Sequence, residues 1–313
     1  MRRRNSGEVS RFILLSGLAG LMAVLLLGCG CVEDGGELQV DSQTIELEGA
    51  ESADVELDME NGNMKVGGGS DELLDAEFRY NVAEWKPEIE YDVQEGKGEL
   101  IVRQPEVRGS GSGTKNEWDL FFNEELPINL KADLENGNSV LSLNSSSMEA
   151  LELSVRNGNM EAEIAGDQPL LEELRLKNSN GNIILGLQGT CPSLTSAAIE
   201  SVNGNIDAEL AGNYASLNSV KMKLNSGIIL ADLSGNWSSD ADIELSVNTG
   251  DITLKLPRET GVYVDVLTPG HVEADGFDRE GSDYVNDAYG ESDVTMRIKA
   301  SSNAGAIKLL LVD

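Results

Sequence analysis

Carboxylates are the most abundant side chains in this sequence that could do chemistry. The 313 residues include 55 Asp and Glu but only one histidine, His271. Two carboxylates about 5–10 Å apart could hydrolyse a glycosidic bond inside a sugar-binding cleft. Such clefts usually also carry aromatic side chains, and aromatic residues make up only 4% of this chain. The carboxylates therefore leave a polysaccharide-active enzyme as a remote alternative.

No other set of residues completes a catalytic or metal site. The single histidine lies beside a glycine turn, with no predicted partner to orient it as a base. The sequence contains no Gly-x-Ser-x-Gly motif, phosphate loop, dinucleotide fingerprint or His-rich metal motif. Cys31 and Cys191 are too far apart for zinc-site spacing or a disulfide framework. We therefore predict that the protein is not an enzyme and has no catalytic residue, cofactor or metal.

Asparagine side chains are the second candidate for a functional site, because an Asn-Gly turn recurs along the chain and would place their amides in a row. The turn glycines are spaced by 23 residues, which is typical of a repeat array. Asn and Gly favour turns with positive φ, and stacked Asn side chains can bond to one another. We interpret these corners as structural turns; the alternative is a ligand-binding edge of amides. No copy has the acidic spacing of a calcium loop. The turn glycines are Gly158, Gly181, Gly204, Gly227 and Gly250.

A strand must follow each turn glycine. The residues two, four and six positions after it are apolar in all five copies, while the residues between them are mixed and often charged. This alternation with period two predicts a strand that buries one face. The apolar positions are Met160, Ile183, Ile206, Ile229 and Ile252; Ala162, Leu185, Ala208, Ala231 and Leu254; and Ile164, Leu187, Leu210, Leu233 and Leu256.

A second strand precedes each turn, with apolar residues seven and five positions before the glycine, such as Leu174 and Leu176. Further glycines at 166, 189, 212 and 235 are expected to close the first strand with positive φ. One such coil cannot bury its inner face alone, but stacked coils share a continuous core. The sequence therefore predicts an all-β fold, a β-solenoid of two-strand coils of about 23 residues.

The N-terminus has the pattern of an export signal. Residues 1–28 combine a head that contains Arg2, Arg3 and Arg4 with an apolar run that is short for a membrane span. The run ends in Leu26-Leu27-Gly28-Cys29, which is similar to a lipobox, so Cys29 is the predicted lipidation site. The alternative is an uncleaved anchor. Both place the body outside the cytoplasm, attached to the membrane, with residues 29–50 as an acidic leader.

The charge is strongly acidic, with a formal net charge of −32 and a pI near 4.2. Such a surface argues against nucleic acid as a partner and against binding of the folded body to anionic lipid. We interpret it as a solvated surface; the alternative is capture of cations or basic peptides.

The order of segments resembles the toastrack family, a β-solenoid of cell-envelope proteins that overlaps with families labelled as adhesins. The resemblance implies an extracytoplasmic module, in some relatives attached to membrane stress-response components, without agreed catalytic residues. This chain has a lipobox where those relatives have several membrane helices. The resemblance rests on Gly67-Gly68, Leu73-Leu74-Asp75-Ala76, Glu99-Leu100-Ile101-Val102-Arg103-Gln104, Trp118-Asp119-Leu120, Leu126-Pro127 and the repeated Gly-Asn/Asp-Ile turns.

We expect residues 51–135 to form an N-terminal β part of the solenoid and residues 136–313 to form the repeats. A further coil is predicted over residues 261–272, followed by an insertion at 276–292 that breaks the period. The insertion concentrates Phe277, Tyr284 and Tyr289, which makes it a candidate recognition loop. The alternative is a cap over the last coil, because solenoid ends require protection.

The predicted function is a non-catalytic, lipid-anchored, adhesin-like protein outside the cytoplasm that binds or spaces cell-envelope components. Its partners would be the membrane, through the N-terminal lipid, and an envelope protein or polysaccharide. The alternative is an envelope-stress sensory or regulatory module that acts with a membrane partner.

Overall fold

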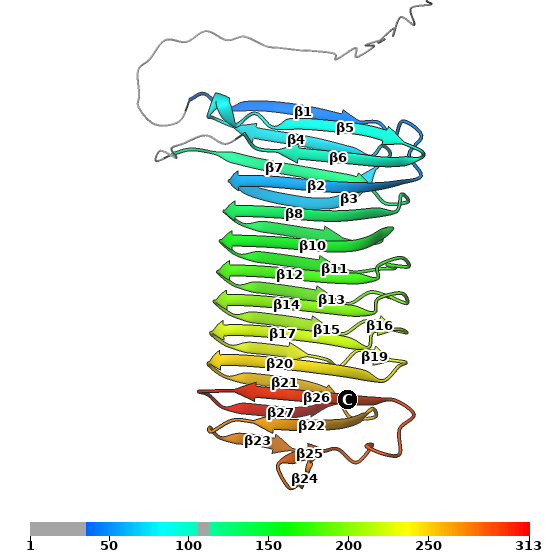
Figure 1. Ribbon diagram of the computed structural model, residues 1–313, viewed down its shortest axis with the longest axis vertical. Coiled ribbons are helices and arrows are strands. Elements are labelled where there is room, and N and C mark those ends of the chain that lie inside the picture. The colour runs from blue at the N-terminus through cyan, green and yellow to red at the C-terminus, as the bar shows by residue number, and fades with distance from the viewer. Residues whose placement is uncertain (1–35, 106–112) are drawn as a thin grey trace, which may run out of the picture. The chain divides into compact units, whose positions relative to one another are not determined.

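The predicted all-β solenoid is confirmed. The computed structural model describes residues 36–105 and 113–313, and these residues form two long sheets and one short ladder of strands. We call the 12-stranded sheet sheet A and the 13-stranded sheet sheet B. Successive strands are stacked along the solenoid (Figure 1). The predicted signal at residues 1–28 and the predicted lipidation site Cys29 lie outside the described residues.

Sheet A contains, in spatial order, β1 (Gln39–Ile45), β4 (Leu74–Tyr80), β7 (Asn116–Asn123), β3 (Asn63–Ser70), β9 (Ser139–Leu143), β11 (Met160–Ile164), β13 (Ile183–Leu187), β15 (Ile206–Leu210), β18 (Ile229–Asp232), β21 (Ile252–Pro257), β27 (Ile307–Val312) and β23 (Val272–Asp275). Sheet B contains β24 (Asp278–Glu280), β25 (Asp283–Val285), β22 (Gly261–Leu267), β26 (Thr295–Ser302), β20 (Ala241–Thr249), β17 (Ser219–Ser226), β14 (Ser196–Asn203), β12 (Glu173–Asn180), β10 (Met148–Asn157), β8 (Ile128–Asn136), β2 (Ser52–Asn61), β6 (Lys97–Arg103) and β5 (Glu88–Gln94). The short ladder joins β16 (Asn213–Tyr214) to β19 (Asn236–Trp237), and one 3-10 helix, η1, spans Ala83–Trp85.

Each central coil is a sheet B strand, an Asn-Gly turn and a sheet A strand. Parallel, in-register pairing places equivalent residues side by side, so that Ile206 of β15 lies opposite Ile183 of β13 and Ile229 of β18. All fifteen apolar residues predicted to follow the turns are buried, as are Leu174 and Leu176 of β12. The core is therefore a set of apolar columns between the two sheets.

The turn glycines are required for two separate reasons. Each has φ between +135° and +147°, a region that L side chains rarely adopt. A Cβ atom on any of the five would also lie between 1.6 and 1.9 Å from the carbonyl oxygen of the turn glycine in the preceding coil. Only hydrogen fits where the stacked turns approach this closely.

The prediction of positive φ at the second set of glycines is right only for Gly166, where φ is +65°, and wrong for Gly189, Gly212 and Gly235. These three need glycine because of close approach instead. A Cβ atom on Gly189 would lie 2.0 Å from the carbonyl oxygen of Gly166, and one on Gly212 would lie 2.3 Å from that of Gly189.

The N-terminal end of the stack is not built in chain order. β2 lies between β6 and β8, so Asn61 is opposite Asn136 although 75 residues separate them in the sequence. After β3 the chain builds β4 to β7 beyond the first coil and then returns with β8. The prediction of a leader over residues 29–50 is wrong for its second half, because β1 pairs antiparallel with β4. β1 buries little of its surface and is held by backbone pairing, which hydrophobic periodicity does not detect.

The C-terminal end repeats this out-and-back path. β22 and β23 form the predicted further coil, but β26 and β27 lie between that coil and the last regular one. The predicted insertion contains the hairpin β24–β25, and β25 pairs antiparallel with the edge of β22. The hairpin therefore covers the outer edge of β22, whose backbone N–H and C=O groups would otherwise be unpaired.

The loops between sheets add a short third ladder. Single parallel bridges join Asp167, Thr190 and Asn213, and β16 then pairs with β19. Here the rings of Tyr214 and Trp237 pack with centroids 5.2 Å apart, and both side chains are buried. Within residues 36–105 and 113–313, no helix is long and apolar enough to cross a membrane.

Candidate binding face

The outward face of sheet B is hollowed along most of the stack. A groove of about 880 Å³ crosses the strands close to their Asn-Gly turns and reaches from β2 to β26. Two smaller hollows, of about 600 and 530 Å³, lie nearer the start of the strands at the N-terminal and C-terminal ends of the same face. Because the groove crosses the strands from β2 to β26 instead of forming one compact hollow, its shape suits an extended chain better than a compact small molecule.

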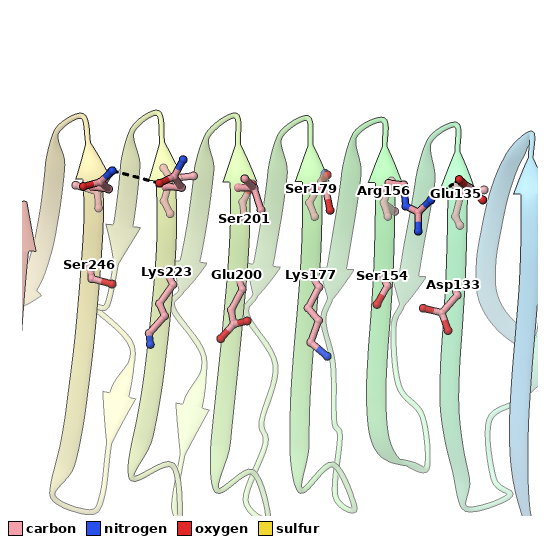
Figure 2. A pocket seen from close by; sticks show the side chains of 18 of the residues that line it. Asp133, Glu135, Ser154, Arg156, Lys177, Ser179, Glu200, Ser201, Lys223 and Ser246 are labelled. Atoms are coloured by element: carbon pink, nitrogen blue, oxygen red, sulfur yellow. Dashed lines mark hydrogen bonds and ion pairs between the residues drawn. The ribbon is translucent and has the colours of Figure 1, made fainter.

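The groove is lined by rows of side chains that the coil register creates. Because outward residues alternate with core residues, the position four residues before each turn glycine gives one row across the sheet. Figure 2 shows the part of this row from Asp133 to Ser246, with one side chain on each successive strand. The row runs Asp58, Asp133, Ser154, Lys177, Glu200, Lys223, Ser246 and Ser301.

Opposite charges are paired along this face. The Lys177 Nζ lies 2.6 Å from Glu152 Oε1, and the Lys97 Nζ lies 2.6 Å from Asp54 Oδ2. Arg156 is paired with Glu135. Such exposed pairs contribute little stability each, about 0–1 kcal/mol. Their effect is to fix side chains and to neutralise the face locally.

The pairing also sets the ionisation of the carboxylates. The hydrogen bond from Lys177 lowers the pKa of Glu152, so this carboxylate stays charged to lower pH than usual. Burial raises the pKa of Asp58; Arg103 opposes the rise, and the nearby charges of Asp133 and Glu56 add to it. The groove therefore has an acidic end, around Asp58 and Asp133, where negative charges crowd together.

Basic residues are concentrated on this face in an otherwise acidic molecule. More than half of the lysines and arginines in the described part of the chain point outward from sheet B, where they alternate with carboxylates. The rest of the described surface carries few cations. The outer face of sheet B still carries more carboxylates than cations, but it is the side on which a polymer meets the least negative charge. These residues are Lys97, Arg103, Lys131, Arg156, Arg175, Lys177, Lys221, Lys223, Arg297 and Lys299.

The asparagine side chains at successive turns, beside the groove, form hydrogen bonds with one another and with the backbone of the next turn. Asn180 donates through Nδ2 to Asn157 Oδ1 at 2.9 Å, and Asn203 donates to Asn180 at 3.0 Å. On the other side of the turn, Asn182 Oδ1 accepts the backbone N–H of Asn205 at 2.9 Å. These ladders support the structural interpretation over the ligand-binding edge.

The candidate recognition residues lie at the C-terminal cap. Phe277 and Tyr284 are partly buried against the core, and the Arg279 guanidinium carbon lies 5.9 Å from the centre of the Tyr284 ring. The ring of Tyr289 packs on Tyr263, with centroids 5.8 Å apart. The three residues thus surround the capping hairpin, which is the arrangement that the capping alternative requires; their role in recognition remains a prediction.

Tyr263 joins the cap to the binding face, and sequence reasoning did not single it out. Its hydroxyl donates to Asp283 Oδ2 at 2.6 Å, and this hydrogen bond, with a smaller contribution from burial, raises the pKa of Tyr263 to about 12. Tyr263 also lines the C-terminal hollow of sheet B. The apolar–polar alternation of residues 261–267 predicts that the Tyr263 side chain points outward. Its contacts could not be predicted, because they are made with the hairpin segment, which does not follow the 23-residue repeat.

Replacing both Tyr284 and Tyr289 with Ser is expected to lower the melting temperature, because the hairpin loses its packing against the core and against Tyr263. Binding per folded molecule is expected to stay unchanged if the segment is only a cap. Thermal unfolding and a cell-surface pull-down on the same double mutant measure both effects. Weakened binding with unchanged stability would instead show that the segment recognises a partner.

No group of three or more His, Cys, Asp or Glu side chains within residues 36–105 and 113–313 is arranged to hold a metal ion. Cys191 is buried in a loop, and burial raises the pKa of its thiol to about 11, so it is a poor nucleophile.

One family model matches the N-terminal part of the chain. Residues 34–181 match the family described as the N-terminal domain of toast_rack, DUF2154. A search of curated proteins finds no match. Three solved structures are similar to the chain. A putative adhesin from Bacteroides fragilis is 15% identical, with 88% of this chain and 97% of that chain covered and a TM-score of 0.42. A putative adhesin from Parabacteroides merdae is 12% identical, with 89% and 98% covered and a TM-score of 0.41. A putative cell adhesion protein from Clostridium sporogenes is 21% identical, with 88% and 100% covered and a TM-score of 0.31.

Proposed function

We propose that the chain is a non-catalytic, adhesin-like cell-surface protein, because residues 34–181 match the toast_rack N-terminal domain family and the same coil geometry continues to the C-terminal cap. In this proposal the outer face of sheet B binds an extended polymer of the cell envelope. The regular stack serves as a rigid support that holds rows of side chains at roughly 4.8 Å intervals.

The observation that carries this proposal is the long groove on the face where the negative charge of the surface is lowest. A groove that crosses successive coils presents polar and charged side chains at regular steps along one line, which suits an extended polymer. Elsewhere the acidic surface repels anionic envelope material and keeps the molecules apart. A polymer would therefore approach most easily along sheet B.

The test is binding without turnover. The purified chain without its predicted signal, residues 29–313 with Cys29 replaced by Ser, would be incubated with wall polysaccharides and with neutral and acidic reference polymers. The proposal predicts saturable retention by at least one polymer and no release of reducing sugar over hours. Release of sugar would establish an enzyme, and no retention by any polymer would contradict polymer binding.

The same proposal includes attachment to the membrane through Cys29, which follows the lipobox-like Leu26-Leu27-Gly28. In the producing cell, Cys29→Ser is expected to remove the lipid anchor or to block processing. Membrane fractionation and the mass of the N-terminal fragment measure these outcomes, and Cys31→Ser is the matched control. A Cys29→Ser protein that stays processed and membrane-bound as before would show that the lipobox interpretation is wrong.

A further inference from the structure

The C-terminal third of the groove contains a patch without carboxylates. It occupies the last two outward positions before the turn on three adjacent strands, β17, β20 and β26. Its side chains are one ammonium, two hydroxyls and three amides. These are Lys223, Asn225, Ser246, Asn248, Ser301 and Asn303, all of which line the groove.

The ammonium at the edge of this patch is not neutralised by an ion pair. Most basic side chains on sheet B lie within 4.0 Å of a carboxylate oxygen, but within residues 36–105 and 113–313 Lys223 has no such partner. Glu200 stands opposite Lys223 on β14 but forms no ion pair with it. Figure 2 shows the side chains of Lys223, Glu200 and Lys177 side by side on neighbouring strands. Lys223 therefore retains three N–H donors for a ligand.

The amides and the Ser246 hydroxyl add further donors, whereas the Ser301 hydroxyl donates to the Leu245 carbonyl oxygen at 3.4 Å and can accept a hydrogen bond from a ligand. Asn303 donates through Nδ2 to Asn248 Oδ1 at 2.9 Å, and Asn248 donates to Asn225 at 3.3 Å. Asn248 and Asn303 each use one N–H in the ladder, and Asn225 donates one N–H to Ser226 Oγ at 3.4 Å, so each amide keeps its second N–H for other acceptors. The hydroxyl of Ser246 lies between Lys223 and Ser301 in the row. A ligand with one anionic group and several hydroxyls matches this set of donors.

The row continues past Ser301 to an apolar contact. Leu267 of β22 lies opposite Ser301, and half of its surface is exposed. Sugar rings have an apolar face as well as polar edges, so an exposed leucine beside hydroxyls and an ammonium suits a saccharide.

We propose that this patch binds the anionic group of an acidic polysaccharide, with Lys223 contacting the charge and Ser246, Ser301 and the amides contacting neighbouring hydroxyls. This inference rests on the proposed function and names the ligand class of its groove. Long-range repulsion by the acidic remainder of the protein is limited at physiological salt, where charges are screened beyond about 8 Å. The shared chemistry is an anion on a hydroxylated chain, and a carboxylate or a phosphate could supply it.

The test uses residues 29–313 with Cys29→Ser and three probes at physiological salt: a uronate polymer, a glycerol-phosphate polymer and neutral dextran. Wild type is expected to bind at least one anionic polymer more tightly than dextran. Lys223→Gln is expected to weaken that binding about tenfold, the size of effect typical of a charged hydrogen bond. Ser246→Glu, which introduces a carboxylate into the patch, is expected to abolish it.

The matched controls are on the opposite sheet. Lys255→Gln removes one positive charge, as Lys223→Gln does, and Ser142→Glu adds one negative charge, as Ser246→Glu does. Both control residues are at outward positions of sheet A. Both are expected to bind as wild type does, and equal melting curves show that each variant is folded. Preference for the uronate polymer identifies a carboxylate ligand, and preference for the glycerol-phosphate polymer identifies a phosphate ligand.

Two outcomes overturn this inference while leaving the proposed function intact. One is binding of dextran as tight as binding of both anionic polymers; the other is unchanged binding of the anionic polymer by folded Lys223→Gln and Ser246→Glu proteins. Failure of wild type to bind any polymer contradicts the proposed function itself.

Discussion

Gly204→Ala is expected to prevent the chain from forming its native stack. The added Cβ atom would lie 1.9 Å from the carbonyl oxygen of Gly181, and the residue would keep a φ of +135°. The obstructing atom belongs to the backbone of the preceding coil, so it cannot move aside without separating the two coils. We expect a loss of more than about 4 kcal/mol in unfolding free energy, seen as insoluble protein or a melting temperature lowered by tens of degrees.

Gly69→Ala is the control that separates the clash from the backbone conformation. Gly69 also has positive φ, +114°, but a Cβ atom there would meet nothing within 4 Å. This variant is expected to lose only about 1–2 kcal/mol. If the two variants melted at the same temperature, the close packing of successive turns would be refuted.

Ile206→Asp is expected to unfold the central coils. Ile206 is fully buried, and its register neighbours are Ile183 and Ile229, so the new carboxylate would have no partner. Burying an unpaired charge costs several kcal/mol, because the group must lose its hydration or take up a proton. The prediction is a loss of more than about 4 kcal/mol, measured by urea unfolding followed by circular dichroism.

The same substitution on the outside is the matched comparison. Ile228 is exposed, and the equivalent position in the next coil is Asp251, so Ile228→Asp is expected to stay within about 0.5 kcal/mol of wild type. An Ile206→Asp protein as stable as the Ile228→Asp protein would show that the predicted register is shifted by one residue.

The sequence predicted the central coils well because each coil obeys the same local rules. Period-two alternation fixes which face of a strand is buried, and a constant interval of 23 residues fixes which residues are neighbours in adjacent coils. Ile183, Ile206 and Ile229 could therefore be placed in one column before any coordinates were known. The rules need no long-range information, since each coil contacts mainly the next.

The ends of the stack could not be predicted in this way. The neighbour of Asn61 is Asn136, and no local pattern shows that the intervening residues fold back as a cap. The same holds for β26, which pairs with β22 across the hairpin segment. At Gly189 the sequence predicted a glycine required for positive φ, whereas the structure requires glycine because of the close contact with Gly166. This contact exists only after the coils have stacked.

The candidate binding face could not be predicted from the sequence either. Total charge says only that the protein is acidic, and the recognition prediction fell on Phe277, Tyr284 and Tyr289. That Lys177 and Lys223 lie in one outward row is implied by the period, but a groove depends on side-chain contacts that the period does not contain. The concentration of cations on one sheet becomes visible only when the strands are assembled.

The central claim is that the outer face of sheet B is the binding surface. The most direct test is to block each sheet in turn. In a chain with Cys29 and Cys31 replaced by Ser, a single cysteine at Ser154, in the groove, or at Ser142, on sheet A, would be labelled with a bulky maleimide. The buried Cys191, with its raised thiol pKa, should not react. The account predicts that the label at position 154 abolishes retention by envelope polysaccharide while the label at 142 has no effect. Loss of retention only with the label at 142, or with neither label, would contradict it.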